Sequence, residues 1–592
     1  MTVNAIKELV DQGKFQAAID QLAQWEADGI FDTFSEQEQI ECLYYQSYAL
    51  HQGLGQQQEA LQIILTARQK YTTPIDRSLL LALLTQQIYT LCNMNRLDEA
   101  REVITEGDAI LASLTAKDRE TGAYWIAFFE ERKGHYYCTK NDFDTALEFW
   151  QRVLALRKKI GDLNALSHSL HNMGGLYRYK DELDTALDYY QQALDIAKQI
   201  GNSHGIADAL TQIGWVYIGK GEIDTALTCY QQALTIYEKS SIPFRIAFAL
   251  GLIVNVYILK GELEAALENC HRWLRLSQEV YQKTENAVNL ARCYYRFAWI
   301  HYLKGELDTA LDYVQQSLAF QGTIGGPYFF FDFIFLSVLI YQAQGEWGTA
   351  LERLQQLLSE VEQWNDTSTA EVLFELVRVV LAQKNRLQAQ GYLSRLQQLQ
   401  TRTPNPWIHL CSRLAEALVL KQSSRVREKF QAQTILEQIV QEEVLRFDLT
   451  ALALIQLCDL LIAEVKFSGE PDVWEEVKAL VDKLYVMAQD QHSVTLMCEA
   501  LLLRAKSAVA DGKLSQAQSC YEQARLTATE KNLPVLLAKV DTEQKRFEAD
   551  FEKMQNLIQS NASLQERVTN ARMEDYLKKI QPLLKMDMSR ES

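Results

Sequence analysis

The chain has 592 residues, of which 48% are apolar and 23% are charged, with 26 Gly and 8 Pro. This composition supports a large folded core and excludes a disordered or collagen-like chain. The net charge of −18, from 77 acidic and 59 basic residues, opposes general binding to nucleic acids or anionic membranes.

Cysteine usage and the N-terminal residues bear on the cellular compartment. The 10 cysteines are scattered, without a C-x-x-C pair, and most fall on core positions of expected helices. This pattern predicts small buried thiols rather than disulfides or metal ligands. Together with an N-terminus that lacks signal-peptide features, it predicts a cytoplasmic protein. The most apolar run, residues 328–341, is too short to span a bilayer and predicts a buried helix.

Alanines recur through the first part of the chain at intervals of about 40 residues. They are Ala18, Ala60, Ala100, Ala146, Ala186, Ala226, Ala266, Ala310 and Ala350. A fixed period of this size indicates stacked helical hairpins, because one hairpin cannot bury its apolar face alone. We therefore expect residues 1–363 to form one regular array.

The repeated unit is clearest in residues 167–270. A small residue stands three positions before an aromatic one, as in Gly174 with Tyr177 and Gly214 with Tyr217. That spacing places both on one helix face, where the small residue lets the second helix of the hairpin approach. Ala226 and its counterparts should face the first helix, where a larger side chain would overpack the crossing.

This pattern of a small residue, an aromatic residue, then Ala, aromatic and Ala resembles the tetratricopeptide repeat family. The resemblance implies an all-α fold, a right-handed α-solenoid of about thirteen helix-turn-helix hairpins. The period exceeds the usual value of about 34 residues, as in long-unit members such as kinesin light chains and the peptide-sensing regulators of bacilli. The units and the tail also resemble uncharacterised archaeal repeat proteins, which implies no particular function.

The pattern weakens after residue 363. A turn is expected at Asn385, but Gln390 stands where the next alanine is expected, and Pro404 and Pro406 must interrupt any helix. Amphipathic helices are expected at residues 430–445 and 474–489, and Ala517 restores the repeat. We interpret residues 364–532 as degenerate repeats that continue the superhelix.

The last segment, residues 533–592, differs from the repeats. Its apolar residues from Leu533 to Ile558 follow steps of four and three, which is typical of a coiled-coil stripe. Ser563 and Glu566 predict a capping box that opens a further helix. Two interpretations stay open: this helical hairpin caps the open end of the solenoid, or it mediates self-association.

No motif for catalysis or cofactor binding occurs in the sequence. It contains no phosphate-binding loop, zinc-protease motif, serine-hydrolase motif or dinucleotide-binding glycine loop. His168 and His171 lie three apart on one expected helix, but no further Cys or His is spaced to complete a metal site. We expect no enzyme activity, no cofactor and no metal.

The family resemblance implies that the first helices of the hairpins line a concave groove. The peptide-binding positions, counted from Gly174, are His171, Asn172, Arg178, Gln212, Trp215, Asn255, Tyr295, Arg296, Trp299 and Tyr302. Asn and Gln can pair with a peptide backbone, and Trp, Tyr and Arg dominate the binding energy of interfaces. Large aromatic residues at helical spacing also build cores, so Trp215 and Trp299 fit either role.

These features predict a scaffold or adaptor that binds a protein or peptide partner in the groove. Arg178 and Arg296 would favour an acidic extended segment of the partner. The alternative is a regulatory sensor whose groove binds a small molecule or signalling peptide, and the lack of a recognisable output domain counts against it. Nucleic acids and membranes are not expected partners.

Overall fold

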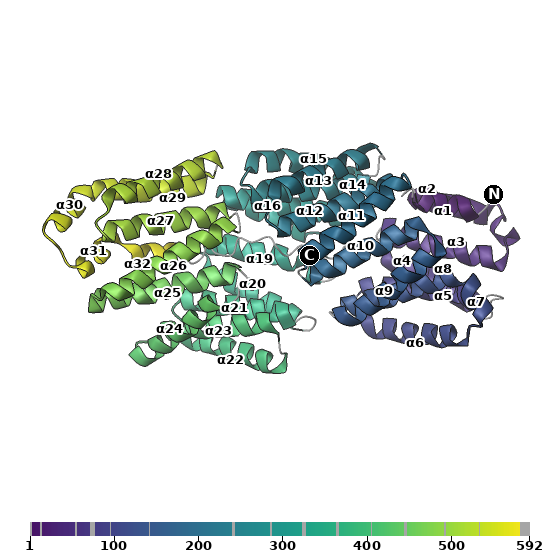
Figure 1. Cartoon of the computed structure of the whole chain (residues 1–592), viewed down its shortest axis with the longest axis horizontal. Helices are drawn as coiled ribbons and strands as arrows, with labels where there is room; N and C mark the ends of the chain where they lie inside the picture. Colours follow the sequence, from purple (N-terminus) through teal and green to yellow (C-terminus); the bar gives the residue numbers. More distant parts are fainter. Residues whose placement is uncertain are drawn as a thin grey trace. The chain divides into compact units, whose positions relative to one another are not determined.

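The computed structural model describes most of the chain. The described residues are 3–11, 15–53, 56–71, 77–94, 96–140, 142–180, 182–239, 243–284, 287–321, 327–362, 366–403, 405–442, 447–490, 493–531 and 533–580. Every regular element within these ranges is helical (Figure 1).

The chain divides into two compact units. Unit 1 comprises Met1–Ile253 and Arg275–Asn286, and unit 2 comprises Val254–Leu274 and Ala287–Ser592. The boundary therefore passes through two helices, α14 (Pro243–Leu259) and α15 (Leu263–Thr284).

Unit 1 is a stack of helical hairpins. Its helices, besides the shared ones, are α1 (Val3–Asp11), α2 (Phe15–Ala27), the 3₁₀ turn η1 (Phe31–Thr33), α3 (Glu36–Tyr48), the π turn η2 (Ala49–Gly53), α4 (Gln57–Lys70), α5 (Arg77–Asn93), α6 (Leu97–Ser113), α7 (Ala116–Thr121), α8 (Ala123–Thr139), α9 (Phe143–Ile160), α10 (Leu163–Tyr179), α11 (Leu183–Gln199), α12 (Ser203–Gly219) and α13 (Ile223–Lys239). Each hairpin packs on the next, as α10 on α11, α11 on α12 and α12 on α13 show. The predicted solenoid of hairpins is confirmed.

The small residues of the repeat lie at the helix crossings, as predicted. Ala18, Ala60, Ala100, Ala146, Ala186, Ala226, Ala266, Ala310 and Ala350 are all 0% exposed. A Cβ on Gly174 would lie 2.8 Å from the ring of Tyr190, and one on Gly214 would lie 2.4 Å from that of Tyr230. The glycines therefore let the tyrosine of the second helix pack directly on the backbone of the first.

The turns inside the hairpins share a geometry. Gly221 has a φ of +76°, a left-handed conformation that glycine adopts without steric cost. Lys220 in the same turn forms an ion pair of 2.7 Å with Asp184 of the preceding repeat, and Lys180 pairs with Asp144 at 3.2 Å. These surface pairs join successive repeats.

Unit 2 continues with hairpins of the same kind. Its helices are α16 (Val288–Lys304), α17 (Leu307–Leu318), α19 (Pro327–Gln344), α20 (Trp347–Val361), α21 (Asp366–Ala382), α22 (Arg386–Arg402), α23 (Pro406–Lys421), α24 (Val426–Gln441), α25 (Phe447–Ser468), α26 (Pro471–Asp490), α27 (Val494–Ala510), α28 (Leu514–Glu530), α29 (Pro534–Ala549), α30 (Phe551–Gln559), α31 (Leu564–Ala571) and α32 (Met573–Ile580). Within α19, Phe331 and Val338 are buried, as expected for the apolar run.

The register expected around Gln390 is wrong by one residue. Asn385 caps α22 by accepting a hydrogen bond from the Gln388 amide, and Ala389, 0% exposed, takes the buried position four residues later. Gln390 itself is exposed. The pattern therefore persists in this hairpin. Pro404 lies outside the described residues, and Pro406 begins α23.

The helices expected at residues 430–445 and 474–489 lie somewhat earlier or extend further, as α24 (Val426–Gln441) and α26 (Pro471–Asp490). In α24, Ala432 is 0% exposed and supplies the small residue that was not expected in this helix. Unit 2 therefore keeps more of the repeat pattern than the sequence indicated.

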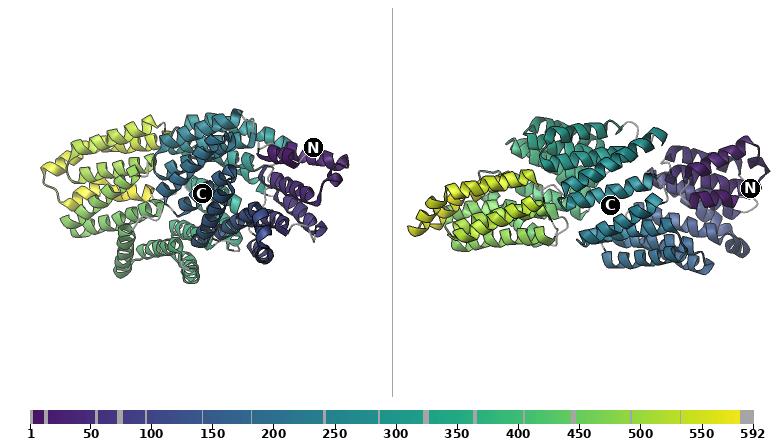
Figure 2. Two further views of the ribbon diagram at one scale, coloured as in Figure 1. Left: turned by 45° about the vertical axis from the view of Figure 1, so that its right-hand side comes forward. Right: turned by 90° about the horizontal axis from the view of Figure 1, so that it is seen from above.

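The C-terminal helices fold back on unit 2. Both α31 and α32, yellow in Figures 1 and 2, pack against α25 and α27, the first helices of their hairpins. Met573 and Tyr576 are buried in this contact, and Lys466 of α25 forms an ion pair of 2.6 Å with Glu574. The capping box of Ser563 and Glu566 at the start of α31 is confirmed.

None of the described helices is both long and apolar enough to cross a membrane.

All cysteines are free thiols, and all but Cys138 and Cys520 are buried. They are small core residues, as the sequence predicted.

Candidate ligand-binding surface on the first helices

A continuous surface in unit 1 is formed by α3, α5, α8, α10, α12 and α14, the first helices of successive hairpins. We call it the first-helix face. Direct packing joins α3 to α5, α5 to α8 and α10 to α12. Side-chain bonds complete the series: Asn172 of α10 donates to Glu131 of α8, and Arg245 of α14 donates to Asp208 of α12.

A buried ion pair lies at the centre of this face. The Arg157 guanidinium donates to the Glu131 carboxylate at 2.6 Å, to the Ser169 hydroxyl at 2.7 Å and to the Ala165 carbonyl at 2.9 Å. Asn172 donates to the second oxygen of Glu131 at 2.5 Å. Burial alone would raise the pKa of Glu131, but Arg157 and its hydrogen bond hold that pKa below its usual value. Glu131 is therefore ionised and fully engaged.

A second pair of opposite charges lies one helix further along. Asp208 accepts hydrogen bonds from the Tyr237 hydroxyl at 2.6 Å and from Arg245 at 2.9 Å, and His204 lies 3.6 Å away. Burial opposes ionisation of Asp208, but these neighbours outweigh it and lower its pKa to about 2. The negative charge of Asp208 and the positive charge of Arg245 thus neutralise each other.

The histidines of the face are neutral at physiological pH. Desolvation lowers the pKa of His51, His135 and His171 to about 4. The hydrogen bonds of His51 agree, because its Nε2 accepts from the Asn93 amide at 2.7 Å and its Nδ1 lies 3.1 Å from the Thr90 hydroxyl. Its proton is therefore on Nδ1.

His168 of α10 is an exposed histidine of this face. Water reaches its side chain, which is exposed, yet desolvation by the surrounding protein lowers its pKa. His168 belongs to α10, next to the charged residues of α8 and α12.

The predicted groove residues of unit 1 lie on this face. His171 is half-buried, with its ring 5.5 Å from that of Tyr190, and Asn172 is bound to Glu131. Gln212 accepts from the Tyr190 hydroxyl at 3.3 Å. Arg178 and Trp215 are half-buried.

The predicted residues of unit 2 are more deeply placed. The side chains of Arg296, Trp299 and Tyr302 are 3%, 5% and 8% exposed. Tyr295 is half-buried, with its ring 4.7 Å from that of Phe333, and Arg296 stacks over Tyr295 at 5.0 Å. Asn255 is half-buried.

The sequence analysis missed the charged residues of α8. Gly134 precedes Gly174 by one period of 40 residues (174 − 134), and a Cβ on it would lie 2.3 Å from the Trp150 ring. Counting back from Gly134 places Glu131 at the position of His171 and Arg132 at that of Asn172. Extending the register by one repeat would have found both.

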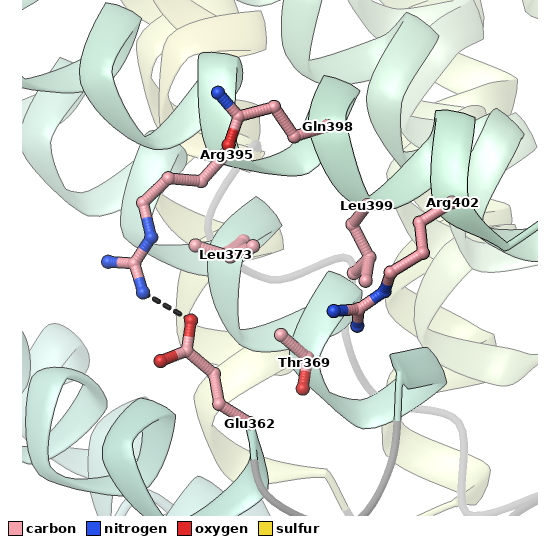
Figure 3. Close-up of a pocket in the computed structure, with 7 residues that line it drawn as sticks. All are labelled: Glu362, Thr369, Leu373, Arg395, Gln398, Leu399 and Arg402. Carbon is pink, nitrogen blue, oxygen red and sulfur yellow. Dashed lines mark hydrogen bonds and ion pairs between the residues drawn. The ribbon is translucent and has the colours of Figure 1, made fainter.

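A separate pocket of about 400 Å³ lies in unit 2 between the end of α20 and helices α21 and α22 (Figure 3). Its lining residues are Glu362, Thr369, Leu373, Arg395, Gln398, Leu399 and Arg402. Arg395 pairs with Glu362 across the pocket, and Arg402 pairs with Asp366 beside it. Both arginines are thus already neutralised by neighbouring carboxylates.

Stacked hairpins with a polar face on the first helices define the class of helical-repeat scaffolds that bind other proteins. The tetratricopeptide repeat family model matches residues 126–199 and 165–239. Residues 126–239 therefore carry tetratricopeptide repeats, which comprise α9 to α13 and most of α8.

Comparison with curated proteins finds no match. Among solved structures, the chain is similar to the quorum sensor NprR from B. thuringiensis, with 14% identity over 62% of this chain and 100% of that one, at a TM-score of 0.42. It is similar to aspartyl phosphate phosphatase F from Bacillus subtilis, with 17% identity over 62% and 95% and a TM-score of 0.40. It is also similar to BtubC from P. vanneervenii, with 17% identity over 38% of this chain and 91% of that one, at a TM-score of 0.31. At these scores the similarity does not bear on ligand or activity.

Proposed function

We propose that the chain is a cytoplasmic, non-enzymatic scaffold or adaptor that binds an extended segment of a protein or peptide on the first-helix face of unit 1. The observation that carries this proposal is the continuity of the face over six consecutive first helices, which carry polar side chains along its length. An extended peptide presents donors and acceptors along its whole length, and such a surface can pair with them.

The charge of the chain supports an acidic partner segment. Arg178 lies on this face near His171, whose pKa it helps to lower. A cationic position within a chain of net charge −18 creates a local site for a carboxylate while the rest of the surface repels it. Arg296, the second arginine expected to contact the partner, is almost wholly buried, so the proposal places the contact in unit 1.

The C-terminal hairpin is assigned a capping role under this proposal. Leu533, Val540 and Met554 of the predicted stripe are buried within the chain, and α29 packs against α28. A stripe that is covered by its own unit has little apolar surface left for self-association.

The pocket of unit 2 favours a second candidate function, a sensor for a small molecule. Its volume suits a small ligand, and the apolar side chains of Leu373 and Leu399 lie between charged ones. Binding there would have to displace or extend the ion pair of Arg395 with Glu362.

Site-specific photo-crosslinking in the native host tests the proposal. A benzophenone amino acid replaces Gln212 on the first-helix face or, as a matched control, the exposed Gln192 on α11. We expect crosslinks to a partner from position 212 and not from 192, with mass spectrometry locating an acidic segment at the linkage. Crosslinks from position 192 alone would move the interface to the outer helices.

A further inference from the structure

The first-helix face holds an arginine, Arg132, whose guanidinium has no hydrogen-bonding partner among the described residues. Arg132 of α8 stacks on the ring of Tyr89 of α5, with 4.0 Å between its Cζ and the ring centroid. Its Nε is buried without a hydrogen-bond partner, and no hydrogen bond or ion pair joins the guanidinium to any side chain in the described part of the chain. The side chain is only half-buried, so the rest of the fork is open to solvent.

Aromatic residues hold this guanidinium in place. The ring of Tyr89 lies 4.8 Å from that of His51 and 5.4 Å from that of His135. Stacking on an aromatic face leaves the edge of the planar guanidinium, with its parallel N–H groups, free to meet a ligand. Arg132 is therefore oriented before any ligand arrives.

Two tyrosines of α3, a helix that packs on α5, contribute to the electrostatic environment of Arg132. After Glu131 and Tyr89, these are Tyr44 and Tyr48, whose rings stack at 6.4 Å. Neither hydroxyl has a hydrogen-bond partner within the described residues. Burial raises the pKa of both tyrosines, so they remain protonated donors.

Arg132 shares the negative charge of Glu131 with Arg157. The adjacent Glu131 is engaged by Arg157 and Asn172, and the nearby His51 and His135 are neutral. Within this group, two guanidinium groups face one carboxylate, an excess of one positive charge. A singly charged anion with two oxygens, a carboxylate, matches this charge and the geometry of the fork.

We propose that Arg132, Tyr44 and Tyr48 form a carboxylate-binding site for the partner segment on the first-helix face. The guanidinium edge donates to both carboxylate oxygens, and the tyrosine hydroxyls donate to the same group. This inference rests on the proposed function and specifies where the acidic segment is recognised. The carboxylate comes either from the C-terminus of the segment or from an Asp or Glu side chain.

Short synthetic peptides of random sequence test the site on the full chain. Peptides that bind on an array are remade in fluorescent form with a free C-terminal acid, with a C-terminal amide, or with Asp and Glu replaced by Asn and Gln. Fluorescence polarisation then measures each form against the wild type and against Arg132→Gln, Arg132→Lys and Tyr48→Phe. Arg152→Gln is the matched control, because Arg152 also stacks on a ring, Phe149, at 4.3 Å but is 60% exposed on α9.

We expect Arg132→Gln to weaken binding at least about tenfold, as for loss of a charge-assisted pair, with Arg152→Gln close to wild type. Arg132→Lys should retain part of the affinity, since lysine keeps the positive charge but lacks the paired N–H donors of the guanidinium. Removing the responsible carboxylate from the peptide should weaken its binding to the wild type as much as Arg132→Gln does. The same change should not weaken binding to Arg132→Gln any further. The peptide form that shows this non-additivity identifies the source of the carboxylate.

The outcomes separate the two proposals. Peptides that bind wild type and Arg132→Gln with equal affinity would overturn the carboxylate site and leave peptide binding intact. Absence of any binding peptide would overturn the proposed function and this site with it. If Arg132→Gln melts at a lower temperature, its weaker binding could reflect lost stability, and the test then uses Tyr48→Phe, which removes only a hydroxyl, and Arg132→Lys. Wild-type affinity of both variants for the acid form of the peptide would overturn the site.

Discussion

Neighbouring glycines of α10 differ in what surrounds them. A Cβ on Gly174 would lie 2.8 Å from Cδ1 and Cε1 of Tyr190, which is closer than real Cβ contacts come. A Cβ on Gly175 would meet only the Tyr190 hydroxyl, at 3.6 Å, an ordinary van der Waals distance. The first glycine is required by packing, and the second is not.

Gly174→Ala should therefore lower the free energy of unfolding by about 1–3 kcal/mol, because the Tyr190 ring must move. Gly175→Ala should raise it by about 0.5–1 kcal/mol, because alanine reduces the entropy of the unfolded chain at a compatible helical site. Thermal and urea melts followed by circular dichroism measure both. Equal effects of the two substitutions would show that Tyr190 does not pack on Gly174.

Charge on the first-helix face is also arranged residue by residue. Glu131 with Arg157, and Asp208 with Arg245, form balanced pairs, so their positive charge is not available to a ligand. Removing one member of a buried pair leaves the other uncompensated, which is costly. The pairs therefore hold the helices together, while recognition is left to side chains with open donors.

At the scale of elements, the C-terminal helices complete unit 2. Val568 of α31 and Leu577 of α32 are 0% exposed, and α31 and α32 pack on α25 and α27. Polar contacts accompany the apolar ones: the Tyr576 hydroxyl of α32 donates to Glu499 of α27, and Lys506 of α27 lies over the Tyr576 ring at 5.2 Å. The terminal helices thus cover the first-helix surface that α25 and α27 would otherwise expose.

Two leucines distinguish a structural role of the tail from a peripheral one. Leu577→Ala should destabilise the chain by about 2–5 kcal/mol, as expected for a large buried side chain. Leu526→Ala on α28 should change stability by less than about 0.5 kcal/mol, since Leu526 is 59% exposed. Hydrogen exchange of α25 and α27 locates the effect. Unaltered protection of these helices in Leu577→Ala would mean that α32 does not pack there.

At the scale of the whole molecule, the response to acid should be uneven. His51, His135 and His171, whose pKa values are lowered to about 4, all belong to unit 1. In the unfolded chain a histidine titrates with its unperturbed pKa of about 6.5. Between pH 6.5 and 4 the unfolded state therefore binds more protons, so stability falls as the pH decreases.

We expect the melting temperature of unit 1 to drop by about 5 °C or more between pH 7 and pH 5. Hydrogen exchange with mass spectrometry assigns the loss of protection to unit 1 or unit 2. The triple variant with His51, His135 and His171 each changed to Gln should show a weaker pH dependence. A triple variant as sensitive to acid as the wild type would place the responsible groups elsewhere.

The sequence by itself determined the helical repeat, the hairpin boundaries over much of the chain and the residues at the crossings. Ala186, Ala226 and Gly174 could be predicted because helix packing is periodic, and one small residue per period marks where two helices meet. The same periodicity placed His171 and Gln212 on the first helices.

Only the tertiary structure decided which polar groups meet. The bond between Asn172 and Glu131, 41 residues apart, and the hydrogen bond between Tyr576 and Glu499, 77 residues apart, depend on how separate hairpins stack. Pairing of this kind leaves no periodic trace, because each contact depends on the distance and angle between two helices rather than on spacing within one. For the same reason, the open guanidinium of Arg132 could be recognised only once the neighbouring charges were seen to be engaged with each other.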